Sequence, residues 1–138
     1  MRQAHPLAQR FPIYLHDAFD ADRFSNFVAA RQDFVVQDHH SYFVFTPSDA
    51  HESGSQHTQD VKGAIAEELA HISERVKGNI IIGEWSGALT PESLAKEADA
   101  AQVRKNFCRA QLSVYANKTA GWAFWCLCSL RNSAIWLA

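Results

Sequence analysis

Hydrophobic positions along the chain change their spacing in a regular order, and the first change marks a strand followed by a helix. Residues 11–16 (FPIYLH) combine a leading proline with aromatic and β-branched side chains, which favours a short strand. Residues 20–31 (DADRFSNFVAAR) follow the helical period, and Asp20 is placed to cap that helix. We expect the helix to pack inward through Phe24, Phe27 and Val28.

A second strand and a longer helix follow. Residues 33–37 (DFVVQ) predict a strand, and residues 38–49 have no helical period and lead into a polar loop that ends at about residue 56. From Thr58 onward, apolar residues recur every three or four positions, which predicts a long amphipathic helix. These apolar residues are Val61, Ile65, Leu69, Ile72 and Val76. Gly78 is placed to end the helix.

Two more strands and one more long helix complete the pattern. Residues 79–83 (NIIIG) predict the third strand, and Thr90 followed by Pro91 is typical of a helix start. A helical spacing then recurs up to Asn117 and Lys118, which close the helix. Its inward-facing residues are Val103, Phe107, Ala110, Gln111 and Val114. Residues 121–125 (GWAFW) predict the fourth strand.

This alternation predicts an α/β fold, because parallel strands need crossover connections and a helix is the usual one. A complete (β/α)8 barrel takes about 250 residues, so four units in 138 residues correspond to about half of one. Half a barrel leaves two sheet edges unpaired, and pairing of two copies through these edges is one expected outcome. The alternative is a small doubly wound sheet, but no glycine-rich phosphate loop follows any predicted strand.

Composition and charge narrow the functional classes. The chain is 47% hydrophobic and 20% charged, as in one globular domain, and a net charge of -2 gives no reason to expect nucleic-acid or membrane binding. Polar residues interrupt the amino-terminal apolar run, so we expect no signal peptide. The cysteines Cys108, Cys126 and Cys128 lack metal-site spacing, and we expect neither a metal nor a cofactor.

Side chains that can do chemistry collect where the predicted strands end, and in parallel α/β folds those ends converge. They are His16, Asp17 and Asp20 after the first strand, Asp38, His39, His40 and Tyr42 after the second, Glu84 and Trp85 after the third, and Trp122 and Trp125 at the fourth. Hydrogen-bonding groups beside flat indoles suit a sugar, which presents hydroxyl groups and apolar faces. A carboxylate in such a cleft can serve glycoside cleavage as nucleophile or as acid/base.

Each of these residues also has another explanation. Glu84 can be an ordinary surface carboxylate at a strand end, and His39 and His40 can be a satisfied loop pair. Trp122 and Trp125 can belong to a barrel core. A zinc site is a further alternative, although the spacing of its ligands matches no common motif. Those ligands would be His16, Asp38, His39 and His40.

Five runs of the sequence together resemble the last four strand-helix units of a fungal exo-1,3-β-glucanase (glucan 1,3-β-glucosidase) of glycoside hydrolase family 5. They are PIYLHDAFDADRFSNFV, DFVVQDHHSYFVFTPSD, SQHTQDVKGAIAEELA, IIGEWSGALTPESLA and AGWAFW. The resemblance covers residues 11–125 in order, and it implies a partial barrel over residues 1–125 that carries strands five to eight. Residues 126–138 (CLCSLRNSAIWLA) depart from the family pattern, and we interpret them as a divergent tail.

The resemblance also implies roles for four residues. Glu84, in GEWS, matches the catalytic nucleophile, which attacks the anomeric carbon and forms a glycosyl-enzyme intermediate. His40 and Tyr42, in DHHSY, match a pair that lines the site beside it. Trp125 matches the tryptophan under the terminal glucose of a β-1,3-glucan substrate.

One departure from the family bears on activity. The general acid/base of the family is the glutamate of an Asn-Glu-Pro motif on the fourth strand, and this sequence contains no Asn-Glu-Pro. We therefore expect the chain alone to be inactive or nearly so, since proton donation to the leaving group contributes about 10²–10⁴ in rate. A non-catalytic carbohydrate-binding fragment, or a pseudoenzyme, is the alternative. The family is typically secreted, but without a signal peptide the sequence leaves localisation open.

Overall fold

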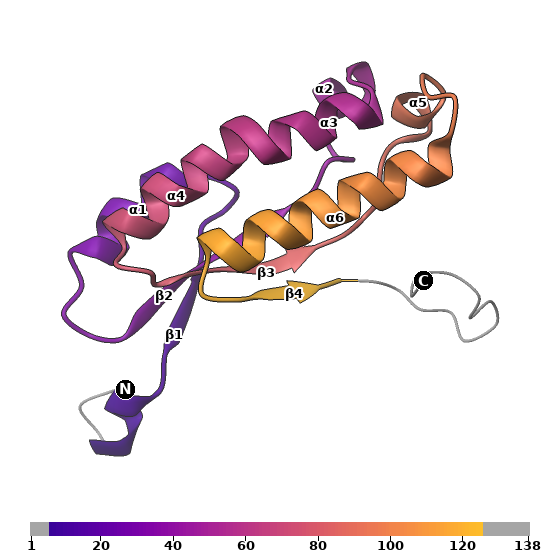
Figure 1. Ribbon diagram of the computed structural model, residues 1–138. Coiled ribbons are helices and arrows are strands. Elements are labelled where there is room, and N and C mark those ends of the chain that lie inside the picture. The colour runs from indigo at the N-terminus through magenta and orange to yellow at the C-terminus, as the bar shows by residue number, and fades with distance from the viewer. Residues whose placement is uncertain (1–5, 126–138) are drawn as a thin grey trace.

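The computed structural model describes residues 6–125 and has a single sheet of four strands. The strands are β1 (Ile13–His16), β2 (Val35–Ser41), β3 (Ile80–Trp85) and β4 (Trp122–Phe124). They are hydrogen-bonded in the order β1-β2-β3-β4, and every neighbouring pair is parallel (Figure 1). The predicted α/β class with a parallel sheet is therefore confirmed.

Helices connect consecutive strands, as the alternating pattern predicts. Those after β1 and β2 are α1 (Ala21–Ala29), α2 (Pro47–His51), α3 (Gly54–Asp60), a π-helical turn η2 (Val61–Ile65) and α4 (Ala66–Arg75). Those after β3 are α5 (Pro91–Leu94) and α6 (Ala100–Lys118), and a short 3-10 helix, η1 (Pro6–Arg10), precedes β1. No helix in the described part of the chain is both long and apolar enough to cross a membrane.

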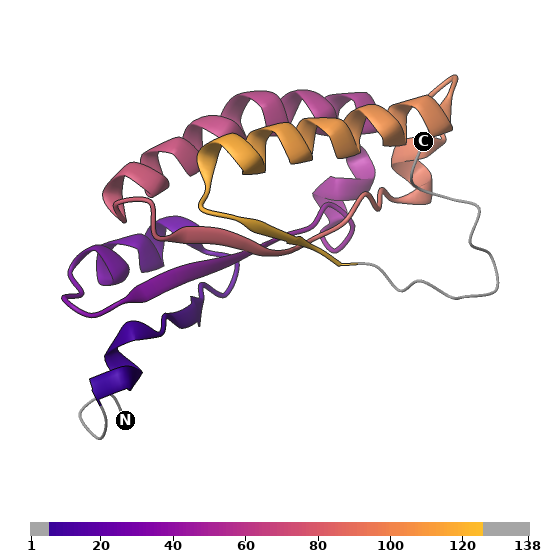
Figure 2. The same ribbon diagram turned by 60° about the horizontal axis from the view of Figure 1, so that its bottom comes forward.

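The two long helical segments lie together on one side of the sheet, and Figure 2 shows no described helix against the opposite face. The hydrophobic core fills the space between α4, α6 and β3. Its most deeply buried large side chains are Trp85, Tyr115, Phe107, Ile72, Ile80 and Ile82. We call the two sides of the sheet the helix face and the open face.

Several local predictions are confirmed by the helix ends. Asp20 caps α1 by accepting a hydrogen bond from the Arg23 amide, and Thr90 caps α5 with Pro91 in its first turn. The helix that contains α4 ends before Gly78, which has a φ of +80°. A positive φ is what glycine tolerates best, so this residue can reverse the chain into β3.

Other local predictions are wrong. Of the three residues expected to pack inward from α1, Val28 is buried and Phe24 is half-buried, but Phe27 is 51% exposed, because the buried face also includes Ala21 and Ser25. The predicted loop between β2 and the long helix contains α2, which begins with a capping box at Thr46, and the long helix starts at Gly54. The spacing of hydrophobic residues did not predict the starts of α2 and α3, because the first turns of both helices are polar.

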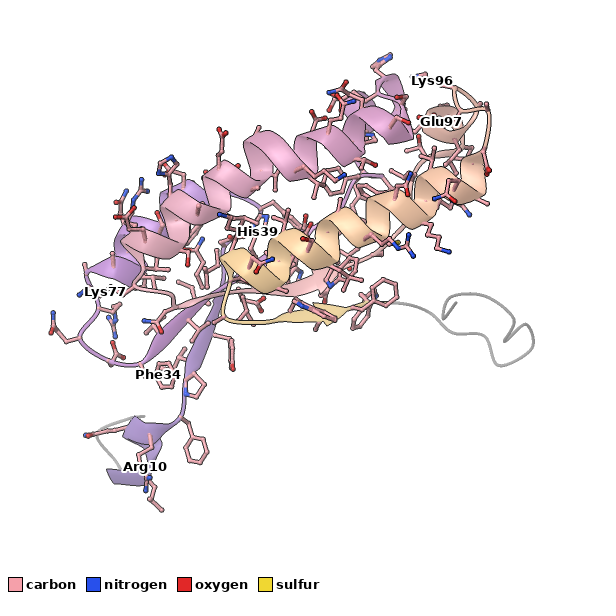
Figure 3. The ribbon with its side chains drawn as sticks, in the orientation of Figure 1. Arg10, Phe34, His39, Lys77, Lys96 and Glu97 are labelled. Carbon is pink, nitrogen blue, oxygen red and sulfur yellow. The ribbon has the colours of Figure 1, made fainter. Side chains whose placement is uncertain are left out.

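The loop between α5 and α6 is tied to the end of α2 and the start of α3 by two neighbouring residues (Figure 3). Lys96 Nζ donates to the carbonyl oxygens of Ala50 and His51. Glu97 accepts from both the amide and the hydroxyl of Ser55, and the amide bond is the main cause that lowers the pKa of Glu97. These contacts hold together the loops that follow β2 and β3 at one end of the sheet.

Candidate active site

The open face carries the candidate site, and a register shift in the sheet determines which residues lie there. Parallel pairing places Asp38 opposite Ile81, and His40 opposite Glu84, with a bulge between these pairs. Because side chains alternate along a strand, Glu84 would share the helix face with Ile80 and Ile82 if β3 were regular. Gly83 is the extra residue, so the bulge turns Glu84 to the open face and the next residue into the core.

Glu84 is bound by the two residues expected beside it. The Tyr42 hydroxyl donates to Glu84 Oε2 at 2.9 Å, and His40 Nδ1 lies 3.4 Å from the same oxygen. Burial, followed by the hydrogen bond to Glu84 and its negative charge, raises the pKa of Tyr42 to about 12. The phenol therefore stays protonated near neutral pH and can donate its hydrogen to the carboxylate.

His40 lies between two carboxylates. Its Nδ1 faces Glu84, and its Nε2 is 3.6 Å from Asp38 Oδ1. The His16 ring packs edge-on against the His40 ring with 4.3 Å between ring centroids. His16 lies on the open face together with Asp38 and His40, since His16 is paired with Asp38 across β1 and β2. The strands extend further than predicted, so Asp38 and His40 lie within β2 instead of following it.

Asp17 and His39 form a separate cluster on the helix face. The Asp17 side chain is fully buried and accepts hydrogen bonds from His39 at 2.8 Å and from Gln37 at 3.1 Å. Burial raises the pKa of Asp17, but the hydrogen bond and charge of His39, together with the bonds from Gln37 and the Phe19 amide, outweigh it and lower the pKa. Ala18 and Phe19 follow with positive φ angles, so this ion pair anchors a strained turn beside the site.

Trp125 directly follows β4, and its amide donates to the Trp85 carbonyl at 2.8 Å. Phe124 is paired with Trp85 on the helix face, so alternation places the Trp125 side chain on the open face with Glu84. Trp125 is 62% exposed and Trp122 is 43% exposed. The expectation that both are core residues is therefore wrong within the described chain, where Trp85 is the buried indole.

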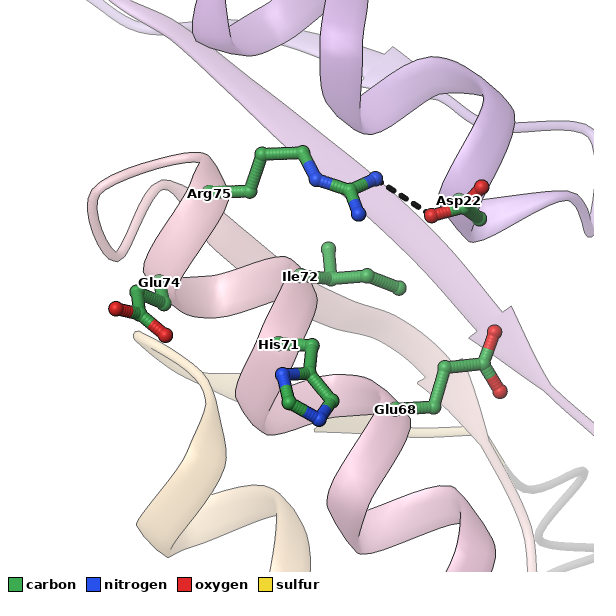
Figure 4. Close-up of a pocket in the computed structure, with 6 residues that line it drawn as sticks. All are labelled: Asp22, Glu68, His71, Ile72, Glu74 and Arg75. Carbon is green, nitrogen blue, oxygen red and sulfur yellow. Dashed lines mark hydrogen bonds and ion pairs between the residues drawn. The ribbon is translucent and has the colours of Figure 1, made fainter.

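Two hollows lie near these elements. One, of about 610 Å³, adjoins the site between the loops after β1 and β2, and its wall includes Phe19, His40, Tyr42 and Phe45. The other, of about 670 Å³, lies between α1 and α4 and is crossed by the ion pair of Arg75 and Asp22 (Figure 4). The first hollow is lined by His40 and Tyr42, the two residues that contact Glu84, although Glu84 itself does not line it.

The zinc alternative is not supported by the geometry. His39 turns to Asp17 on the helix face, and His16 Nδ1 accepts a hydrogen bond from the Ala18 amide. In the described residues, a different group, Glu52, His57 and Asp60, brings three potential ligand atoms within 4.8 Å. Its polar groups already have partners: His57 contacts the Asp49 carbonyl and Glu52, and Asp60 accepts from Gln56. We assign no ion to it.

Sequence reasoning missed Gly83 as part of the site, and it named Asp38 only among the strand-end side chains and the zinc alternative, not as a partner of His40. A signal for the bulge does exist in the order of residues, since IIIGEW places an apolar residue, Trp85, where regular alternation requires an open-face position. The contact of Asp38 with Gly83 could not be predicted, because it joins two different strands. Cys126 and Cys128 lie outside the described residues, and Cys108 is a free thiol whose pKa burial raises.

The fold and the site define an α/β protein with a carboxylate-centred candidate active site at the carboxyl ends of parallel strands. No family model matches the chain. It is 34% identical over 116 residues to glucan 1,3-beta-glucosidase 3 of Schizosaccharomyces pombe, a match that covers 83% of this chain and 24% of that protein. Over 81 residues it is 37% identical to glucan 1,3-beta-glucosidase of Yarrowia lipolytica, covering 56% of this chain and 18% of that protein.

A third relative is glucan 1,3-beta-glucosidase 2 of Candida albicans. It is 27% identical over 125 residues, and the match covers 67% of this chain and 25% of that protein. The chain therefore spans between about a fifth and a quarter of the length of these curated relatives. The chain is a homologue of fungal glucan 1,3-β-glucosidases and corresponds to part of such a protein. The predicted relationship is confirmed.

Proposed function

We propose that this chain supplies the nucleophile side of a retaining 1,3-β-glucosidase site, as the C-terminal half of a (β/α)8 barrel of glycoside hydrolase family 5. The observation that carries the proposal is the pair of contacts from Tyr42 and His40 to one oxygen of Glu84. A carboxylate held in this way, on the open face of the sheet, has one oxygen bound and the other available to a reacting carbon. The names of the curated relatives supply the substrate class, a β-1,3-glucan.

Each site residue has a defined task in this proposal. Glu84 attacks the anomeric carbon of the terminal glucose and forms a covalent glycosyl ester. Tyr42 donates a hydrogen bond to the carboxylate before attack and still donates to its oxygen when the ester forms. His40 restricts the Glu84 side chain from the other side, and Trp125 offers an exposed indole on which a pyranose ring can stack.

The acid/base must come from elsewhere in this proposal. Retaining cleavage uses a second carboxyl about 5 Å from the nucleophile, and the sequence has no Asn-Glu-Pro motif. Since the relatives are about four times longer than the aligned region, further strands in such a protein can supply it. We therefore propose that the chain alone does not hydrolyse unactivated glucan at a measurable rate.

An activated substrate separates the nucleophile from the missing acid. Dinitrophenolate leaves without protonation, so 2,4-dinitrophenyl β-glucoside should react with Glu84 even when no acid/base is present. We expect a burst of at most one dinitrophenolate per chain, followed by slow turnover. The burst should vanish in Glu84→Gln and persist in Glu97→Gln, a control carboxylate near the end of α5. A folded chain that shows no burst would contradict the proposal.

A non-catalytic carbohydrate-binding role is the second candidate. It is favoured by the exposure of Trp125 and by Phe45, which is 75% exposed beside the site. Laminarin that quenches tryptophan fluorescence saturably, in a chain with no dinitrophenolate burst, would select this function over the first.

The sheet edges are part of the proposal as well. Ile13 and Tyr14 in β1, and Trp122 and Phe124 in β4, are all more than two-fifths exposed. Apolar edge strands of this kind are prone to pair with further strands. We propose that either further barrel strands or a second copy of the chain pairs there, and sedimentation equilibrium of the chain distinguishes a monomer from a dimer.

A further inference from the structure

The Asp38 carboxylate lies in the space that a side chain at position 83 would need. A Cβ atom added to Gly83 would lie 1.8 Å from Asp38 Oδ1 and 2.7 Å from Asp38 Cγ. Real Cβ contacts are never this short, so any residue other than glycine would force the carboxylate or the strand to move. Gly83 is therefore needed here for close approach rather than for an unusual backbone angle.

The same glycine is the bulged residue of β3. The shift it introduces pairs His40 with Glu84 and places Glu84 on the open face. Without the bulge, alternation would exchange the two residues that follow, so Trp85 would leave the core and Glu84 would enter it. Trp85 is only 2% exposed and packs edge-on against Tyr115 and Phe124. The core therefore favours the bulged register strongly.

Asp38 links this bulge to the site. Its Oδ1 is buried and accepts no hydrogen bond within residues 6–125, yet it lies 3.6 Å from His40 Nε2. A buried carboxylate oxygen without a hydrogen bond is costly, and such atoms in a folded protein call for an explanation. The explanation that fits is attraction to the His40 ring, whose other nitrogen faces Glu84 at 3.4 Å.

We propose that Gly83 and Asp38 form one positioning unit for Glu84: the missing side chain at position 83 admits the Asp38 carboxylate, which orients His40, while the bulge aims Glu84 at His40 and Tyr42. This inference deepens the proposed function and rests on it only where Glu84 is called the nucleophile. The geometric claim stands on the contacts alone. Neither Gly83 nor Asp38 touches the reacting atoms, so both are positioning residues.

Ionisation of Tyr42 reports this geometry without any substrate. With a pKa of about 12, only about a tenth of Tyr42 is ionised at pH 11, whereas an unperturbed phenol with a pKa of about 10 would be about nine-tenths ionised. The signal is the tyrosinate absorbance within milliseconds of a pH jump, before the chain unfolds. Subtracting the trace of a matched Tyr42→Phe variant in each background isolates this one residue.

We expect Gly83→Ala to raise the ionised fraction of Tyr42 at pH 11, because Glu84 no longer faces the phenol and only burial then raises the Tyr42 pKa. Gly63→Ala is the matched control, since a Cβ there meets no atom within 4 Å, and it should leave the fraction unchanged. The double variant Asp38→Ala with Gly83→Ala should return the fraction toward the original value, because the space is then free. An unchanged Tyr42 signal in Gly83→Ala would overturn the proposal.

Folding failure is also informative in this design. If Gly83→Ala does not fold but the double variant does, then the carboxylate and the added methyl group compete for one space, as proposed. If neither folds, the steric explanation is wrong. The dinitrophenolate burst separates this inference from the proposed function. A Tyr42 response without a burst would support the positioning unit and contradict the glucosidase role. A burst without a Tyr42 response would support the glucosidase role and contradict the positioning unit.

Discussion

The helix face and the open face of the sheet contrast within a single strand. On the helix face of β3, Ile80, Ile82 and Trp85 are at most 2% exposed and contact the hydrophobic core. On the open face, Glu84 is 30% exposed and contacts a phenol and an imidazole. The difference shows that one strand can contribute to the hydrophobic core through one face and to the proposed chemistry through the other. The bulge at Gly83 determines which residues of β3 lie on each face.

The largest expected effect comes from breaking the helix face. Trp85→Ala removes a buried indole that contacts Tyr115, Trp122 and Phe124. A large-to-small change of this kind typically lowers the free energy of unfolding by about 3–5 kcal/mol. Urea denaturation followed by circular dichroism measures this loss. A loss below about 1 kcal/mol would show that Trp85 is not the core residue described above.

The buried Asp17 carboxylate at the edge of the helix face should give the next largest effect. Asp17→Asn weakens the hydrogen bonds from His39 and Gln37, which should cost about 1–3 kcal/mol near neutral pH. Because folding lowers the pKa of Asp17 below its ordinary value of 3.8, its stabilising contribution is complete above about pH 5 and is lost as the pH falls through the folded pKa.

Unfolding curves of the wild type and Asp17→Asn should therefore converge as the pH falls from 5 to 2. The sign matters here: curves that converge on raising the pH instead would mean that the carboxylate is not stabilised in the folded state.

On the open face, Tyr42→Phe should affect chemistry much more than stability. The Glu84 carboxylate is partly exposed, so water can replace the lost donor, and the free energy of unfolding should change by less than about 1 kcal/mol. The rate of the dinitrophenolate burst should fall about 10- to 100-fold, the equivalent of one hydrogen bond to a charged group. Stopped-flow absorbance measures it. An unchanged burst rate would remove Tyr42 from the proposed mechanism.

The smallest effect on stability is expected at the end of β4. Trp125→Ala removes an exposed side chain and should change the free energy of unfolding by less than about 0.5 kcal/mol. Laminarin affinity should nevertheless fall, whereas Trp122→Ala, on the helix face of the same strand, should keep it. Fluorescence titration compares the two variants, and equal losses would place sugar binding elsewhere.

The sequence predicted elements well where one face is consistently apolar. The spacing of Leu69, Ile72 and Val76 located α4, and the caps at Asp20 and Thr90 located two helix starts. The start of the long helix and the whole of α2 were missed, since their residues are polar and their stability comes from capping and tertiary contacts. Phe27 misled the prediction for α1, because an exposed phenylalanine fits a helical period as well as a buried one does.

The site was only partly predictable for a related reason. Glu84, His40 and Tyr42 were identified from the sequence, and the structure brings these three together. Their convergence depends on a bulge that inverts the alternation of β3, and on Asp38 filling the space beside Gly83. Such inter-strand packing is set by atoms far apart in the sequence, so local patterns in a single chain do not encode it visibly.

Covalent trapping of Glu84 tests the central claim most directly. A 2-deoxy-2-fluoro-β-glucoside with an activated leaving group forms the glycosyl ester and slows its hydrolysis, so the adduct can be found by intact mass and located by peptide mapping. The open-face nucleophile predicts one adduct per chain, on Glu84, and none in Glu84→Gln. An adduct on any other carboxylate, or none on a chain shown to be folded, would contradict it.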